Sequence, residues 1–127
     1  MTQMPMNGQN WFARLTIFVA GILGAAGVAS AAGAAHTGDP QILGALALVA
    51  LTQAPALLAL GLHAGRSQTL RIAAGLIGLG ALLFSADLAA VHFLGASPMR
   101  FLAPVGGTLL IAGWIVIAVC ALVPRRS

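Results

Sequence analysis

Asp87 is the residue best placed to do chemistry in this sequence, because it is an acid inside a long apolar segment. It lies in the segment from Ile72 to Leu94, about four residues past the centre, where an ionised carboxylate costs about 2.5 to 3.5 kcal/mol on membrane-insertion scales. We therefore expect Asp87 to be neutral, paired or in contact with water. It would serve either as a proton or cation site or as a buried hydrogen-bonding group that fixes helix packing or partner docking.

Few polar residues are available as ionic or hydrogen-bonding partners for Asp87. Arg100 and His36 are expected on the side of the membrane toward which Asp87 is displaced, so we expect them to be its charged partners. Gln53 and Ser85 are the expected neutral donors. A proton relay through a membrane needs a second ionisable group in the other half of the bilayer, and the segments carry none at that depth. The sequence therefore favours the buried hydrogen bond over the ion site.

The histidines do not form a cofactor site in the sequence. Haem held by two histidines needs both to project from facing helices, and only His36 and His92 belong to the same end of the molecule. His92 follows Asp87 by five residues, so the two do not share a helix face. The single cysteine, Cys120, excludes an internal disulfide. Because nucleophile–base pairs, phosphate loops and zinc spacings are also absent, we expect no enzyme, no cofactor and no metal.

Four apolar segments must position these side chains. The chain has 127 residues, of which 60% are hydrophobic and 6% charged, with a mean hydropathy of +1.01. A soluble domain carries roughly a quarter charged residues, so this composition excludes one. A membrane-crossing helix needs about 20 mostly apolar residues. We predict an all-α integral membrane protein, a single membrane domain over residues 1–127 whose four helices form a compact bundle, with spans at about 12–35, 41–63, 71–94 and 101–123.

The arginines predict the orientation of these spans. With four spans, the N-terminus, the second connection and the C-terminus share one side. That side holds Arg14, Arg66, Arg71, Arg125 and Arg126, and the other side holds Arg100. Positive residues favour the cytoplasmic side, so we predict both termini in the cytoplasm, in a bacterial inner membrane. The sequence pI near 11.7 reflects the scarcity of acids, so nucleic acid is not an expected partner.

Two local features qualify this topology. Residues 1–32 also resemble a secretory signal, with an A-x-A-like site at Ala29–Ala31, and cleavage there would leave three spans. The apolar run continues past that site, so we favour four. Asp39 followed by Pro40 predicts an N-cap for the second helix, in which the Asp carboxylate accepts from free helix N–H groups. Pro55, near the middle of that span, is expected to kink it.

Small residues recur at spacings that favour close helix packing. Helices in a membrane associate through close packing and buried hydrogen bonds, because lipid is as apolar as the helices themselves. The first segment repeats small residues at threes and fours, including Gly21, Gly27, Ala25 and Ala29. We expect helix packing to involve Gly24, Gly33, Gly106, Gly107, Gly113 and Trp114. Some of these faces, the first helix's above all, are candidates for docking with another protein or a second copy.

Most of the chain, from about Gly21 to Leu122, resembles a known family, and the resemblance is strongest in the last third. The stretch from Gly80 to Leu88, then Ala103 to Gly107, and Gly113 with Trp114 resemble the pattern of the YgdD and transmembrane-protein-256 family of small four-helix membrane proteins, a domain of unknown function. Ala31 to His36 matches its first-helix motif in part. This chain departs from the pattern at Asp87, where the family has a small or hydroxyl residue, and at Pro55, where it has a histidine. The resemblance implies the topology and assigns no activity.

Two functions follow as hypotheses. The first is a small membrane protein that acts by binding, as an accessory or assembly subunit of a larger membrane complex, with the lipid bilayer and other membrane proteins or further copies of itself as partners. It rests on the small-residue faces and on the scarcity of residues outside the spans. The alternative is a small transporter or ion-conducting homo-oligomer in which Asp87 and Gln53 line a path past Pro55.

Overall fold

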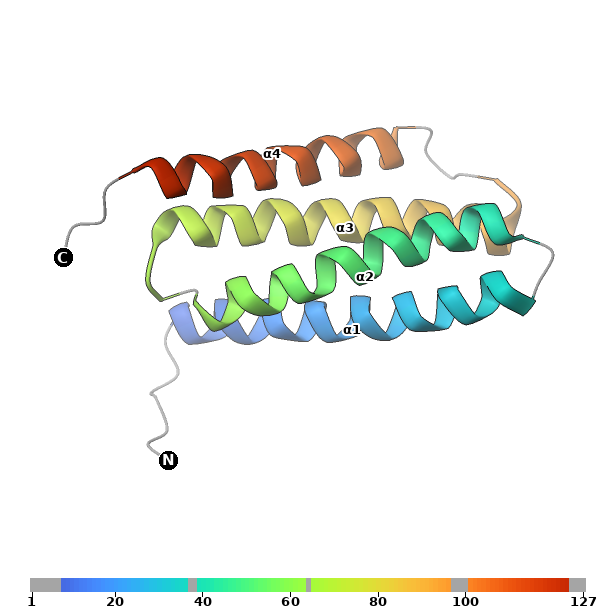
Figure 1. The fold of residues 1–127 in the computed structure, drawn as a ribbon, viewed down its shortest axis with the longest axis horizontal. Coiled ribbons are helices and arrows are strands. Elements are labelled where there is room, and N and C mark those ends of the chain that lie inside the picture. The colour runs from blue at the N-terminus through green and yellow to red at the C-terminus, as the bar shows by residue number, and fades with distance from the viewer. Residues whose placement is uncertain (1–7, 37–38, 64, 97–100, 124–127) are drawn as a thin grey trace, which may run out of the picture.

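The computed structural model describes residues 8–36, 39–63, 65–96 and 101–123, and these residues form helices and their connections, with no strand among them (Figure 1). The four helices are α1 (Gly8–His36), α2 (Pro40–Leu62), α3 (Gln68–Leu94) and α4 (Leu102–Leu122). Each contains a stretch long and apolar enough to cross a membrane. The prediction of an all-helical chain with four such helices is therefore confirmed.

The ends of α3 are set by two local signals. Ser67 is its N-cap, and the hydroxyl of Ser67 accepts a hydrogen bond from the backbone N–H of Leu70 at 3.4 Å. At the other end Gly95 has a φ of 79°, a left-handed conformation that glycine adopts without a Cβ penalty. Its N–H donates to the carbonyl of Val91 at 3.0 Å. These two caps determine where α3 begins and ends.

The start of α2 differs from the expectation. Pro40 occupies the first helical turn as predicted, but the side chain of Asp39 makes no capping hydrogen bond. The prediction that the Asp39 carboxylate caps α2 is wrong, because that carboxylate contacts another helix, as described below. Further along, α2 continues through Pro55 as one helix to Leu62.

The arrangement of the helices is more open than the predicted compact bundle. Consecutive helices run in opposite directions, so α1 and α3 begin at the end of the molecule where α2 and α4 finish (Figure 1). Packing is extensive between α1 and α2 and between α3 and α4, smaller between α2 and α3, and slight between α1 and α3. Among the described residues, the backbone of α4 approaches α3 alone. In lipid, apolar helix faces need not be hidden, so no solvent force closes such a bundle.

The core lies mainly where α1, α2 and α3 meet. Leu57 of α2 and Ile77 of α3 are fully buried, and small side chains fill the space around them: Ala20, Ala50, Ala54, Ala73, Ala74 and Ala81. Large apolar side chains are exposed on all four helices, among them Phe18, Leu48 and Leu79. An outer surface so continuously apolar is suited to lipid rather than to water.

Candidate functional site

A polar pair links α2 to α3 at the end of the molecule where α2 begins. The Nδ1 atom of His92 lies 2.9 Å from Oδ2 of Asp39, and both side chains are partly buried. The ring of His92 also packs edge-on against Phe93, with centroids 4.7 Å apart. A proton on Nδ1 makes His92 the donor to the carboxylate, and a second proton on the ring makes the contact an ion pair. Sequence reasoning placed both residues at this end of the molecule and did not pair them.

A second polar contact links α4 to α2. The indole Nε1 of Trp114 donates to Oε1 of Gln53 at 2.9 Å. Gln53 Nε2 donates to the hydroxyl of Thr52 at 3.2 Å, and that hydroxyl donates to the carbonyl of Leu48 at 2.7 Å. A short chain of hydrogen bonds therefore crosses between two apolar helices whose backbones do not approach each other. Gln53 was expected to donate a hydrogen bond to Asp87, but it accepts one from Trp114 instead.

Asp87 is buried near the C-terminal end of α3, with 6% of its surface exposed, and it does not lack a partner. Arg100, its expected partner, lies outside the described residues. The Ser85 hydroxyl, an expected donor, is buried without a hydrogen-bond partner in the described part of the chain. His36 is exposed at the last position of α1. Of the expected neutral donors, the structure therefore brings neither Ser85 nor Gln53 to Asp87.

Glycines carry the contact between α3 and α4. A Cβ placed on Gly106 would lie 2.7 Å from the backbone N of Phe84 and 2.8 Å from the carbonyl O of Gly80. One placed on Gly80 would lie 2.7 Å from the carbonyl O of Gly106. At Gly113 the nearest atom, Cγ1 of Ile77, would be 2.5 Å away. These distances leave no room for a side chain, so the two helices touch backbone to backbone at Gly80 and Gly106, and the side chain of Ile77 packs against Gly113.

Of the other glycines expected at helix contacts, Gly24 and Gly33 lie at one and Gly107 does not. A Cβ on Gly33 would lie 3.0 Å from Cδ1 of Leu43, and one on Gly24 would lie 3.7 Å from Cβ of Ala54, so both face α2. A Cβ on Gly107 would have nothing within 4 Å. Adjacent residues on a helix point about 100° apart, so Gly106 and Gly107 do not both face α3. The structure therefore does not place Gly107 at a helix contact, contrary to the expectation.

Helix α1 carries small residues on two faces. On the inner face Gly27 is buried, and a Cβ there would lie 2.6 Å from Cγ of Leu51 on α2. On the outer face Gly21, Ala25 and Ala29 recur every fourth position, and all three are exposed. Nothing lies within 4 Å of a Cβ on Gly21. We call Gly21, Ala25 and Ala29 the outward stripe, since residues four apart share one side of a helix.

The described residues provide several contacts between helices and a free thiol. No three His, Cys, Asp or Glu side chains within them lie close enough together to hold a metal ion. Cys120 is a free, partly buried thiol on α4. The arrangement provides two polar side-chain pairs between helices, His92–Asp39 and Trp114–Gln53, together with a glycine contact and the outward stripe.

Comparison with known proteins places the chain in a family. A family model described as a protein of unknown function (DUF423) matches residues 23–107, about two thirds of the chain. The match covers all of α2 and α3, about half of α1 and the start of α4. No curated protein and no solved structure matches the chain. The family model confirms the resemblance to a domain of unknown function, and the chain belongs to the DUF423 family.

Proposed function

We propose that the chain is an integral protein of a bacterial inner membrane and works by binding, as an accessory or assembly subunit of a larger membrane complex. Four long apolar helices and their exposed apolar side chains support insertion. Arg14, Arg66 and Arg71 all lie at the end where α1 and α3 begin, which supports a cytoplasmic location for that end and for both termini.

The outward stripe of α1 is the observation that carries the binding role. Elsewhere on the same helix, Gly27 lets α1 approach α2 closely. Small residues at every fourth position let the backbone of a second membrane helix approach, and this spacing is enriched at helix–helix interfaces. The outward stripe repeats that spacing on the side of α1 that its own chain leaves exposed. The fitting partner is an apolar helix of another membrane protein.

Blocking the outward stripe tests the proposal. In the double variant Gly21→Leu with Ala25→Leu, bulky side chains would hold a partner helix away while meeting little of their own chain, since Gly21 faces open space. Gly107→Leu is the matched control, because it adds a similar side chain at an open position on α4. Each form is extracted from native membranes in mild detergent, separated by native electrophoresis and identified with its partners by mass spectrometry.

We expect the wild type and Gly107→Leu to migrate with a large complex, and the stripe variant to migrate alone. A wild-type chain that migrates alone, or a stripe variant that stays in the complex, contradicts the proposal. In the second case, mass spectrometry of the band identifies the partner, and the contact surface must lie outside the outward stripe.

The burial of Asp87 favours a second candidate, a small transporter or ion-conducting homo-oligomer. The substitution Asp87→Asn separates the two functions, because it removes the charge and keeps the size. If the chain conducts ions, the variant should lose conductance in reconstituted vesicles while the assembly stays intact. If Asp87 serves docking, the variant should instead no longer migrate with the complex. If neither changes, Asp87 serves the fold alone.

A further inference from the structure

An apolar groove of about 180 Å³ runs between α1 and α3, with the buried side chain of Leu57 of α2 among its lining. The groove exists because α1 and α3 pack only slightly against each other and because α3 presents Gly75 and Gly78 there. A Cβ on Gly75 would meet nothing within 4 Å. The hydroxyl of Thr16 in the wall donates to the carbonyl of Phe12 in its own helix at 2.8 Å. The groove therefore offers an apolar surface along its length.

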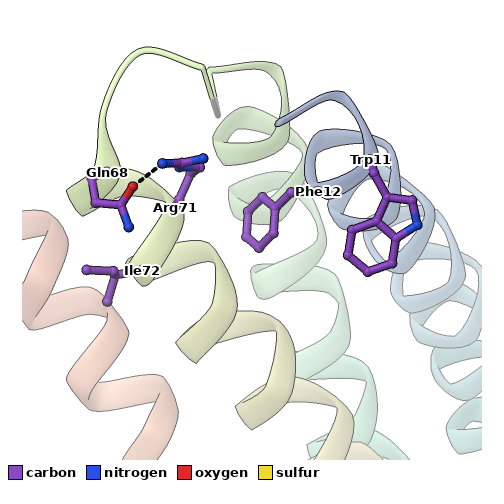
Figure 2. Close-up of a pocket in the computed structure, with 5 residues that line it drawn as sticks. All are labelled: Trp11, Phe12, Gln68, Arg71 and Ile72. Atoms are coloured by element: carbon purple, nitrogen blue, oxygen red, sulfur yellow. Dashed lines mark hydrogen bonds between the residues drawn. The ribbon is translucent and has the colours of Figure 1, made fainter. Parts of the chain in front are cut away.

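A second depression, which holds the guanidinium of Arg71, adjoins this groove at the end where α1 and α3 begin. Its volume is about 430 Å³, and Figure 2 shows its lining, which is Trp11 and Phe12 from α1 and Gln68, Arg71 and Ile72 from α3. Phe12 lines both the depression and the groove. The guanidinium of Arg71 donates to Oε1 of Gln68 in the first turn of α3. Trp11 is 60% exposed. Tryptophan and arginine at a helix end are typical of the headgroup level of a bilayer.

The charge at this end of the molecule is positive. Arg14 near the start of α1 and Arg66 just before α3 lie at the same end as Arg71. The two acids of the chain lie toward the opposite end, because Asp39 immediately precedes α2 and Asp87 is near the C-terminal end of α3. An anionic group at the depression is attracted by the arginines and lies at the opposite end from both aspartates.

We propose that the groove and the depression together bind one anionic phospholipid, with its phosphate beside Arg71 and one acyl chain along Gly75 and Gly78. Leu82, which also lines the groove, is eleven positions beyond Arg71, a distance of about 16 Å along the helix. One leaflet of a bilayer contributes about 15 Å of hydrocarbon, so the groove matches the depth of one acyl chain. A partner helix is about 10 Å wide with its side chains, too broad to enter a groove of this volume.

This inference rests on the proposed membrane location and not on docking through the outward stripe, which uses other residues of α1. Flotation of the chain with native membranes tests the location separately. A chain that fails to float refutes both proposals, whereas the lipid measurements below refute this one alone.

Native mass spectrometry of the purified full chain in detergent tests the lipid site. The chain is titrated with dioleoyl phosphatidylglycerol or with dioleoyl phosphatidylcholine, which have the same acyl chains. We expect one phosphatidylglycerol to bind more tightly than phosphatidylcholine, and Arg71→Gln to reduce that preference about fivefold. Arg66→Gln is the matched control, because it removes the same charge at the same end from a residue that does not line the depression. We expect it to keep the preference.

A second variant tests the acyl-chain part of the site. Gly75→Leu points a side chain into the open groove, so we expect weaker binding of both lipids with thermal stability unchanged. Millimolar inorganic phosphate should not displace the bound phosphatidylglycerol, because the acyl chain contributes to binding. The proposal is overturned if Arg66→Gln and Arg71→Gln act alike, if Gly75→Leu leaves lipid occupancy unchanged, if phosphate displaces the lipid, or if Gly75→Leu dissociates a dimer instead.

Discussion

Replacing Gly106 with alanine tests whether backbone contact with α3 holds α4 in place. The new Cβ would lie 2.7 Å from the backbone N of Phe84 and 2.8 Å from the carbonyl O of Gly80. Favourable contacts between carbon and its neighbours begin at about 3.5 Å. No side-chain rotation can move the two backbone atoms, so α4 must shift away from α3. Because α3 is the helix that the backbone of α4 approaches, such a shift loosens the attachment of α4 as a whole.

The size of the effect follows from two opposing contributions. Adding atoms to a well-packed contact costs about 1 to 3 kcal/mol. Replacing glycine by alanine inside a helix stabilises it by about 0.5 to 1 kcal/mol. We therefore expect Gly106→Ala to lower the free energy of unfolding by about 1 to 2 kcal/mol. Gly107→Ala is the matched control, since its Cβ meets nothing within 4 Å, and it should be neutral or slightly stabilising.

The free energy of unfolding is measured by titrating dodecyl sulfate into mixed micelles and following far-ultraviolet circular dichroism. The chain has two tryptophans, so a Trp11→Phe background leaves Trp114 as the sole fluorophore and reports on α4 directly. In this background the Gly106→Ala transition should occur at lower dodecyl sulfate than the Gly107→Ala transition. Equal stability of the two variants would refute the claim that backbone contact at Gly106 holds α4.

The remaining predictions concern the two polar side-chain pairs between helices, Trp114–Gln53 and His92–Asp39. In a double-mutant cycle of Gln53→Leu and Trp114→Phe, we expect a coupling of about 0.6 kcal/mol, and no more than about 1.7, the range typical of hydrogen bonds between helices in membranes. Strict additivity would mean that this hydrogen bond does not hold α4 to α2. In a cycle of Asp39→Ala and His92→Ala, we expect about 1 kcal/mol of coupling, because both side chains remain partly exposed. Added salt should weaken this second coupling, and a coupling indifferent to salt would argue against a charged pair.

Much of the fold could be predicted from the sequence, because membrane spans are a property of composition over about 20 residues. The first span was expected from about residue 12 and the third from about 71, whereas α1 begins at Gly8 and α3 at Gln68. Helices commonly extend past the apolar core, because the polar residues there lie at headgroup level. Gly24 and Gly33 were expected at helix contacts, and both face α2.

The candidate site was predicted less well. Asp87 and Gln53 were expected together, yet Gln53 bonds to Trp114. Asp39 was expected to cap its own helix, yet it bonds to His92. Asp87 and Gln53 were identified correctly as polar residues in apolar segments, but Gln53 was given the wrong partner, as was Asp39. A signal for the second pair was present, since the topology places the start of α2 beside the end of α3.

The sequence by itself determined the number, approximate length and alternating direction of the helices, together with the family, because these depend on local composition and short motifs. Only the tertiary structure decided that Gly106 rather than Gly107 meets α3, that within the described residues the backbone of α4 approaches neither α1 nor α2, and that a groove separates α1 from α3. The physical reason is that helical periodicity states which residues share a face, whereas the face that meets a given neighbour depends on packing between segments distant in the chain.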